Sequence, residues 1–290
     1  MSADEIQRVG VVGCGLMGSG IAEVCARAGR SVMVVEVDPA ALARGRNRIE
    51  TSVRRAVSAG KLSEDEGAAT LGRIEIGTDI GALGDRQLLV EAVVESEPEK
   101  LRVFEVLDKV VEAPDALLTS NTSSIPIIKL AMGTRRPEQV VGLHFFNPVP
   151  VLPLVEVVAS LLSSGESVSR AEAFAVDALG KTAIRSKDRA GFVVNALLIP
   201  YVLSAIRMVE SGFATTEDID SGMVKGCAHP MGPLALADLI GLDTTMAVAD
   251  SLYEEFKEPL YAPPALLARM VEAGLLGKKT GRGFFEYPRP

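Results

Sequence analysis

The sequence predicts an α/β domain with a mainly parallel sheet, followed by an all-helical C-terminal domain. Short Val/Ile/Leu runs alternate with helical patterns over residues 1–186, and the strand-like runs then stop. Apolar strands that alternate with helices are typical of a parallel sheet covered on both faces. The 290 residues suffice for two domains, which we expect at 1–186 and 187–290.

The expected elements follow from these patterns in chain order. Six apolar runs predict strands at 8–13, 31–38, 87–95, 116–123, 140–146 and 154–158. Helical patterns in the first domain cover 16–28, 39–59, 97–112 and 168–180. In the second domain they cover 191–211, 216–226, 233–256 and 263–273, separated by segments such as "HPMGP".

Composition argues against several classes of protein. With 48% hydrophobic and 23% charged residues the chain is typical of globular proteins, and its net charge of −8 disfavours nucleic-acid or anionic-membrane binding. The polar start "MSADEIQRVG" is unlike a signal peptide. The longest apolar stretch contains Asn195 and Pro200 and is too short to span a bilayer easily. Because Cys14, Cys25 and Cys227 form no CxxC pair, we expect a reducing, cytoplasmic location and no metal site.

A glycine motif follows the first expected strand. Gly13, Gly15 and Gly18 in "VGVVGCGLMGSGIA" form G-x-G-x-x-G between a strand and a helix. There Gly13 permits a tight turn, Gly15 lets a pyrophosphate approach the backbone, and Gly18 lets the helix pack on the strand. Leu16 and Met17 belong to the same loop. The motif predicts a Rossmann-type dinucleotide site, and a glycine-rich turn without a cofactor is the alternative.

Glu36 ends the second expected strand, 23 residues after Gly13. A carboxylate there can accept hydrogen bonds from the hydroxyls of the adenosine ribose and would repel a 2′-phosphate. The sequence therefore favours NAD over NADP. An exposed glutamate at the end of a strand is the alternative.

His144 closes the strand in "VGLHFFNP", and Glu156 lies within the next apolar run, "LVEVV". A glutamate inside a buried strand is costly unless it is paired. The loop of prolines and apolar residues between them would bring the two strands side by side, so that Glu156 would orient the imidazole of His144 for proton transfer. The alternatives are a structural histidine in the core and an edge-strand glutamate that reaches water.

Several longer segments resemble one family. "GCGLMGSGIA", "VEAVVE", "SNTSSIPI", "GLHFFNPVPVLPLVEVV", "DRAGFVVN", "HPMGPLALADLIGLD" and "GKKTGRGFFEY" occur in that order. Together they resemble the 3-hydroxyacyl-CoA dehydrogenase family, particularly the short bacterial 3-hydroxybutyryl-CoA dehydrogenases. The resemblance covers residues 8–287.

The resemblance implies roles for individual residues. His144 is then the catalytic base and Glu156 its partner, and Ser123 and Asn195 complete the catalytic site. A hydroxyl and an amide can both hydrogen-bond the C3 oxygen of the substrate as its charge changes. The further cofactor contacts that it implies are Glu95, Lys100, Ser123, Asn147 and Lys279. Glu36 stands where many members of the family have aspartate, which preserves the carboxylate.

Residues 44–61 carry a local positive charge of +5, because six basic residues face only Glu50. Such a concentration could receive the phosphates of CoA. The resemblance points to Ser52 and Lys61 as CoA contacts, and we add Arg54 and Arg55. A solvated basic helix face is the alternative.

The resemblance implies an NAD-dependent dehydrogenase that transfers hydride between NAD(H) and C3 of a short (S)-3-hydroxyacyl-CoA such as 3-hydroxybutyryl-CoA. It also implies a homodimer formed through the helical domain, and we expect a cytoplasmic protein that takes a small acyl-CoA substrate and binds neither nucleic acid nor membrane. Fatty-acid metabolism is one pathway that fits. The alternatives are a dehydrogenase of a non-CoA hydroxy acid, such as a sugar acid, and a non-catalytic dinucleotide-binding protein.

Overall fold

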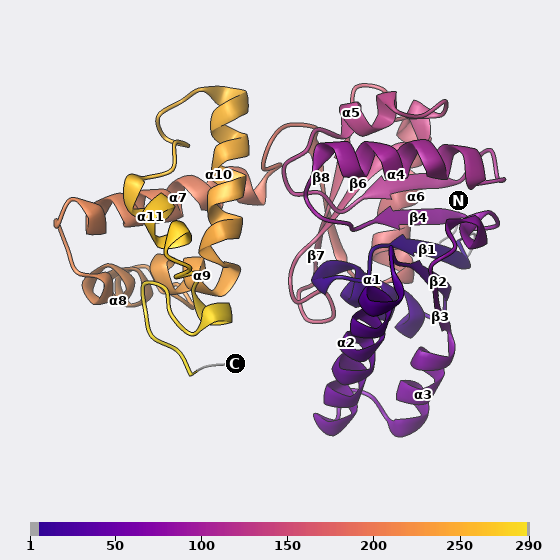
Figure 1. Cartoon of the computed structure of the whole chain (residues 1–290), viewed down its shortest axis with the longest axis horizontal. Helices are drawn as coiled ribbons and strands as arrows, with labels where there is room; N and C mark the ends of the chain where they lie inside the picture. The colour runs from indigo at the N-terminus through magenta and orange to yellow at the C-terminus, as the bar shows by residue number, and fades with distance from the viewer. Residues whose placement is uncertain (1–5, 289–290) are drawn as a thin grey trace. The chain divides into compact units, whose positions relative to one another are not determined.

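The computed structural model describes residues 6–288. The chain divides into two compact units, Met1–Asp188 and Arg189–Pro290 (Figure 1). The division falls two residues after the boundary expected from the sequence. Each unit has a hydrophobic core of its own.

The first unit is built on one eight-stranded sheet in the order β3-β2-β1-β4-β5-β6-β7-β8. Its strands are β1 (Arg8–Val12), β2 (Ser31–Val35), β3 (Ile74–Gly77), β4 (Leu88–Glu91), β5 (Leu117–Ser120), β6 (Val140–Phe145), β7 (Leu154–Ala159) and β8 (Thr182–Lys187). All neighbouring strands are parallel except β6 and β7. The predicted mainly parallel sheet is confirmed.

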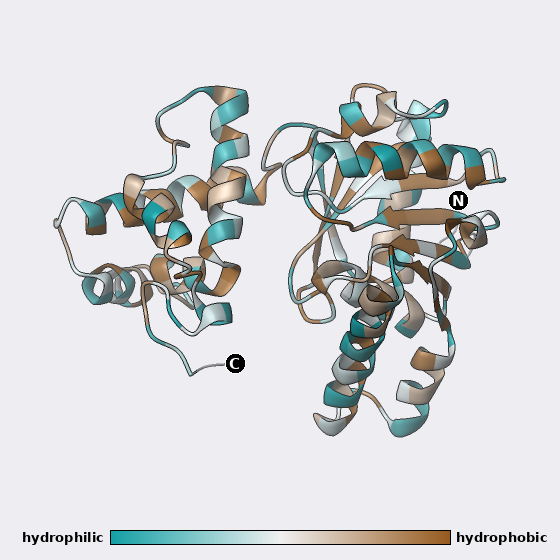
Figure 2. Ribbon diagram, in the orientation of Figure 1, coloured by the Kyte–Doolittle hydropathy of each residue, from teal (hydrophilic) through white to brown (hydrophobic). Residues whose placement is uncertain are grey.

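Helices cover both faces of this sheet. The core on one face joins α1 (Leu16–Arg27), α2 (Pro39–Ser58) and α6 (Gly165–Ala173), which a π-helical turn at Phe174–Ala178 extends. On the other side lie α4 (Glu97–Val110) and α5 (Ile127–Met132) (Figure 1). Helix α3 (Glu64–Gly72) packs against α2, and short 3₁₀ turns span Ile80–Leu83 and Pro137–Gln139. Figure 2 shows the central strands in hydrophobic colours and much of α2 in hydrophilic colours.

The second unit is helical, as predicted. It contains α7 (Val194–Glu210), α8 (Thr216–Gly226), α9 (Pro233–Ile240), α10 (Leu242–Phe256) and α11 (Ala265–Glu272), with a 3₁₀ turn at Lys278–Thr280. The single helix expected over 233–256 is two helices, because Gly241 between them adopts a φ of 104°. Within residues 6–288, no helix combines the length and apolar character needed to cross a bilayer.

Candidate active site

His144 and Glu156 are direct partners across the antiparallel pair β6–β7. Nδ1 of His144 lies 2.7 Å from Oε2 of Glu156, and both residues are buried, with 6% and 0% of their surface exposed. Alternate residues of β6, such as Leu143 and Phe145, face the core under α1 and α6. His144 therefore faces the α5 side of the sheet, and a Cβ added to Gly142 on that side would lie 3.1 Å from Ile127 Cδ1.

The turn between His144 and Glu156 is held in place by residues outside the turn. Nζ of Lys181 donates hydrogen bonds to the carbonyls of Val149, at 2.6 Å, and Leu152, at 2.7 Å. Burial and the nearby charge of Arg27 lower the pKa of Lys181. Val149 packs so closely on Gly20 of α1 that a Cβ there would lie 2.9 Å from its Cβ. The geometry of the His–Glu pair thus depends on a turn anchored to α1 and to Lys181.

The glycine loop has the shape that a dinucleotide requires. Gly13 adopts a φ of 92°, and a Cβ on it would lie 2.7 Å from the carbonyl oxygen of Ala92. A Cβ on Gly18 would collide with the carbonyl oxygen of Gly13, whereas one on Gly15 would meet nothing within 4 Å. Gly15 also occupies the N-cap of α1, where a glycine has no side chain to cap the helix. The open space before this helix N-terminus fits the pyrophosphate of NAD. Leu16 and Met17 form the first turn of α1.

Glu36 bonds to the same loop. Its Oε1 accepts from the amide of Cys14 at 2.5 Å, and its Oε2 accepts from the amide of Val37 at 3.0 Å. The carbonyl oxygen of Cys14 accepts a hydrogen bond from Arg48 at 3.4 Å. Burial and the charge of Glu36 raise the pKa of the Cys14 thiol to about 11. Cys14 is therefore a protonated packing residue, and Glu36 sets the position of the loop.

Ser123 lies just beyond the end of β5, and Glu95 holds its loop. Oε1 of Glu95 accepts from the amides of Ser123, at 2.9 Å, and Ser124, at 3.2 Å, and from the hydroxyl of Thr122, at 2.5 Å. Burial acts to raise the pKa of Glu95, but the Lys100 charge and these bonds outweigh it and hold the pKa below its ordinary value. Two residues that the sequence associates with the cofactor and with catalysis thus contact each other.

Lys100 is buried beneath this loop, with 1% of its side chain exposed. Its Nζ lies 2.7 Å from Oε1 of Glu91 and 3.2 Å from Oε2 of Glu95. Glu91, which ends β4 and is fully buried, also accepts from the hydroxyl of Ser120 at 2.6 Å. Glu91 is not among the site residues predicted from the sequence. The signal was present, because Glu91 interrupts an apolar strand in the same way as Glu156.

Asn121 is a second residue that sequence reasoning missed. Its Oδ1 accepts from the amide of Phe145 at 2.8 Å, which ties the end of β5 to the end of β6 beside His144. Nothing in its local sequence distinguishes it from a turn asparagine. Asn147, an expected cofactor contact, follows the same strand and is exposed.

The remaining two predicted residues belong to the second unit. Asn195 is half-buried in the first turn of α7. Lys279 lies in the 3₁₀ turn near the C-terminus, where its Nζ bonds both carboxylate oxygens of Asp243, at 2.5 and 2.6 Å. Within residues 6–288 no group of three or more His, Cys, Asp or Glu side chains is arranged to hold a metal ion.

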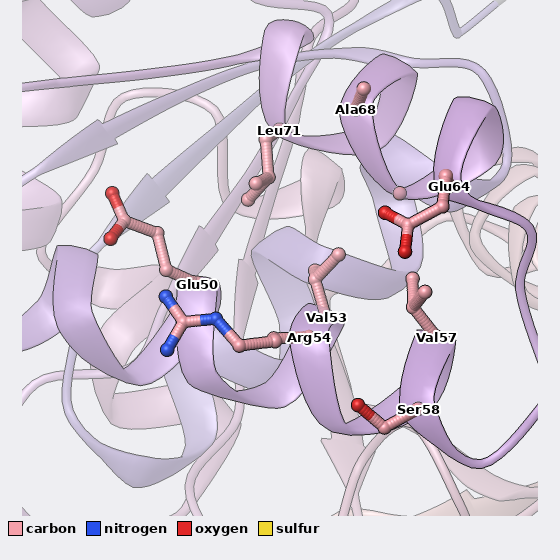
Figure 3. A pocket seen from close by; sticks show the side chains of 9 residues that line it. Glu50, Val53, Arg54, Val57, Ser58, Glu64, Ala68 and Leu71 are labelled. Carbon is pink, nitrogen blue, oxygen red and sulfur yellow. The ribbon is translucent and has the colours of Figure 1, made fainter.

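A groove of about 350 Å³ runs between α2 and α3 (Figure 3). Its lining residues are Glu50, Val53, Arg54, Val57, Ser58, Glu64, Gly67, Ala68 and Leu71. Of the four predicted CoA contacts, Arg54 lines this groove, while Ser52, Arg55 and Lys61 lie nearby on the chain but not in its lining. The walls combine apolar side chains with one guanidinium and two carboxylates, so the positive charge predicted for 44–61 is only partly present in the groove itself.

Comparison with known proteins identifies one family over both units. Residues 8–189 match the family "3-hydroxyacyl-CoA dehydrogenase, NAD binding domain", and residues 191–287 match its "C-terminal domain". A 3-hydroxybutyryl-CoA dehydrogenase of Mycobacterium tuberculosis is 61% identical over 98% of this chain and 100% of its own.

Two solved structures are similar throughout. FadB2 of Mycobacterium tuberculosis superposes with a TM-score of 0.97 at 61% identity and covers 98% of this chain and 99% of its own. The (S)-3-hydroxybutyryl-CoA dehydrogenase of Ralstonia eutropha gives a TM-score of 0.92 at 43% identity and covers 98% and 100%. Both domains of one family match in order along nearly the whole chain, so this protein belongs to the 3-hydroxyacyl-CoA dehydrogenase family and is an NAD-dependent oxidoreductase.

Proposed function

We propose that this protein is an (S)-3-hydroxybutyryl-CoA dehydrogenase, which interconverts the C3 hydroxyl and the C3 ketone of a short acyl-CoA with NAD(H). The observation that carries the proposal is the buried His144–Glu156 pair on the strand next to the Ser123 loop. The full-length 61% identity to a relative of that name supports the substrate.

His144 exchanges the proton of the substrate hydroxyl. Since Nδ1 is hydrogen-bonded to Glu156 at 2.7 Å, the exchange falls to Nε2. The Glu156 carboxylate accepts a hydrogen bond from Nδ1–H of His144, which fixes the tautomer whose Nε2 can accept a proton, and its charge stabilises the imidazolium that forms. In oxidation His144 takes the hydroxyl proton, and in reduction the imidazolium returns a proton to the C3 oxygen.

NAD, when bound, accepts the hydride that leaves C3 and, in its reduced form, donates it. The chain's part is to hold the dinucleotide. We assign this to the open Gly15 position at the N-terminus of α1, with Glu36 on the adenosine ribose. The other proposed cofactor residues are Gly13, Leu16, Met17, Gly18, Glu95, Lys100, Ser123, Asn147 and Lys279.

Ser123 hydrogen-bonds the C3 oxygen in this proposal, and Asn195 keeps the catalytic role that the family resemblance gives it. Donors at that point stabilise the charge that develops on the oxygen during transfer. The Ser123 amide already bonds Glu95, which supports a fixed position for its hydroxyl.

The CoA part of the substrate is assigned to α2 and the groove beside it. Val53, Val57 and Leu71 give the groove an apolar wall for the uncharged parts of CoA, and Arg54 is a cation for its phosphates. Arg55, Ser52 and Lys61 complete the proposed contacts. This assignment favours a CoA thioester over a sugar acid, which has no use for the groove.

We extend the proposal to a cytoplasmic homodimer that acts in fatty-acid metabolism. Exposed apolar side chains of the second unit support a subunit contact, among them Leu197 and Phe213, with 73% and 76% of their surface exposed. Free Cys14, Cys25 and Cys227 support a reducing compartment. A non-catalytic dinucleotide-binding protein is disfavoured, because it would not need an ordered proton-transfer pair.

The test is the oxidation of NADH by the purified protein with acetoacetyl-CoA, followed at 340 nm and repeated with NADPH. We expect rapid turnover with NADH and slow turnover with NADPH. If neither cofactor is consumed while NADH still binds, the substrate is not a short acyl-CoA and the sugar-acid alternative takes its place.

A further inference from the structure

We propose that Lys181 is a positioning residue: it holds the turn between β6 and β7, and through that turn it sets the position of Glu156 against His144. The inference rests on the proposed function, in which this pair exchanges the proton of the substrate. It gives a part in the reaction to a lysine that belongs to none of the sequence motifs and that the proposed mechanism does not use.

The turn between the two strands is too long to fix their register by itself. Residues 146–153 separate the end of β6 from the start of β7, whereas the loop of a hairpin usually has about two to five residues. Inside the turn, the carbonyl oxygen of Pro148 accepts from the amides of Val151 and Leu152, both at 2.9 Å. These bonds close the tip of the turn but do not tie it to the rest of the unit, so contacts from outside the turn have to do so.

Lys181 supplies two such contacts. Its Nζ donates to the carbonyl oxygens of Val149, at 2.6 Å, and Leu152, at 2.7 Å. In the part of the chain that the structure describes, these two carbonyls accept no other hydrogen bond, and Lys181 makes no ion pair with a carboxylate. A hydrogen bond from a charged donor is roughly twice as strong as one between neutral groups. The ammonium group of Lys181 therefore fixes both sides of the tip.

The backbone around Lys181 is itself fixed. The amide of Lys181 donates to the carbonyl oxygen of Ala175 at 2.9 Å, in the helical segment that follows α6. The amide of Thr182, the next residue, donates to the carbonyl oxygen of Pro153 at 2.8 Å, and β8 then runs parallel to β7. Lys181 thus holds the turn from a backbone that is bonded on both sides.

Glu156 depends on the turn more than His144 does. The strand of His144, β6, pairs with the buried strand β5, and Asn121 accepts a hydrogen bond from the amide of Phe145 at its end. The strand of Glu156, β7, begins directly after the turn, and its other neighbour is β8, the partly exposed strand at the edge of the sheet. A movement of the turn would therefore displace Glu156 relative to His144. A small displacement suffices to weaken a bond of 2.7 Å and to turn the imidazole away from the substrate.

The experiment compares Lys181→Met, which nearly keeps the length of the side chain but removes its charge and donors, with Lys181→Arg, which keeps both. The reduction of acetoacetyl-CoA by NADH gives kcat and KM. We expect Lys181→Met to lower kcat about 10–100-fold while the KM for acetoacetyl-CoA changes less than about threefold, because the proposed CoA contacts lie on α2 and in the groove beside it. Lys181→Arg should recover kcat to within about fivefold of the wild type.

The chain's two histidines allow the geometry of the pair to be measured without turnover. Protein labelled with ¹⁵N in histidine alone gives imidazole signals from His144 and His229, and His229→Gln assigns them. At one fixed pH, the shifts of the two ring nitrogens report the tautomer and its hydrogen bonds. We expect Lys181→Met to displace the signals of His144 and to leave those of His229, in the second unit, unchanged. Lys181→Arg should give the wild-type signals.

An unchanged kcat in Lys181→Met would overturn the inference. A lower kcat with unchanged His144 signals would do the same, since Lys181 would then affect the reaction without moving the pair. Displaced signals of both histidines would mark Lys181 as a residue of general stability instead. A Lys181→Arg variant no more active than Lys181→Met would show that the donors to the turn are not what the reaction needs.

Lys187→Met is the matched control, because it removes an exposed lysine from the far end of the same strand. Its kcat and both sets of histidine signals should equal those of the wild type. If Lys181→Met does not fold, Lys181→Gln, which has amide donors but no charge, takes its place. We then expect kcat to fall about threefold to tenfold with displaced His144 signals, and an unchanged kcat would refute the role of Lys181.

The two proposals fail in different ways. A wild type that does not reduce acetoacetyl-CoA would refute the proposed function, whatever the histidine signals of the variants show. An active wild type together with an equally active Lys181→Met would refute only the role of Lys181 and leave the proposed function intact.

Discussion

Two regions of the first unit carry the proposed function in opposite ways. At the carboxyl edge of the sheet, Glu91, Lys100, His144 and Glu156 are all at most 6% exposed, and each is hydrogen-bonded to a named partner. In the groove between α2 and α3, Arg54 and Glu64 are exposed on helix surfaces. In the proposed function, the chemistry is assigned to buried, hydrogen-bonded side chains, and CoA binding is assigned to exposed ones.

The physical difference is the access of water. Buried polar groups interact strongly and cost free energy when a partner is lost, whereas an exposed ion pair contributes only about 0.2–1 kcal/mol. If the sheet edge performs the reaction and the groove only binds, substitutions should lose effect in the order sheet edge, cofactor loop, groove. A different order would break the comparison.

The largest effect is expected at the sheet edge. In His144→Gln the general base is lost while the size and polarity of the side chain are roughly kept, and kcat should fall about 10²–10⁴-fold. The rate of NADH oxidation with saturating acetoacetyl-CoA measures it. His229→Gln, which changes the chain's other histidine in the second unit, is the matched control and should be nearly as active as the wild type. A loss of less than about tenfold in His144→Gln would remove the general-base role.

An intermediate effect is expected at Glu36, which is half-buried. Glu36→Ala removes the bond to Cys14 and the carboxylate proposed for the ribose. Charge-assisted bonds of this kind contribute about 1.5–3 kcal/mol, which corresponds to roughly a 10–100-fold higher Kd for NADH. Use of NADPH relative to NADH should improve, because the repelling charge is gone and Arg48 stays beside the loop.

Glu50→Ala on α2 controls for the loss of one carboxylate near this surface. Fluorescence titration with both reduced cofactors measures the preference. If the ratio of the two affinities stays at its wild-type value in Glu36→Ala, then Glu36 positions the loop but does not contact the ribose.

The sequence predicts most of the fold because the central strands are buried on both faces. Continuous apolar runs revealed β1, β2 and β4 to β7. The strands β3 and β8 escaped prediction because they are partly exposed and interrupted by polar residues, as in "TAIRSK". Two helices were missed as well: α5 is only six residues long, and α3 is acidic and nearly without an apolar stripe, although Ser63 and Glu66 form a capping box that marks its start.

The site residues also divide into those that a local pattern predicts and those that it does not. The local spacing of Gly13, Gly15 and Gly18 predicts their role, and Glu156 is recognisable as a charged residue inside an apolar strand. The partners of Glu91 lie nine and 29 positions away in the sequence, and Lys181 donates hydrogen bonds to a turn about 30 residues upstream. Such contacts depend on the register of the sheet and on the packing of α4, which no local pattern specifies.

The smallest effect is expected in the groove, where two adjacent arginines allow a sharp test. Arg54 lines the groove, and Arg55, which is next to it and also exposed, does not. Charge reversal in Arg54→Glu should raise the KM for acetoacetyl-CoA about threefold to tenfold, with kcat unchanged, because exposed charges contribute little each. Arg55→Glu should have the smaller effect.

The effect of Arg54→Glu on the KM should shrink with the pantetheine thioester of the same acyl group, which lacks the nucleotide phosphates. It should also shrink at high salt, which screens exposed charges. Equal KM changes for the CoA and pantetheine thioesters would return α2 to a solvated basic face and leave the recognition of CoA to other residues.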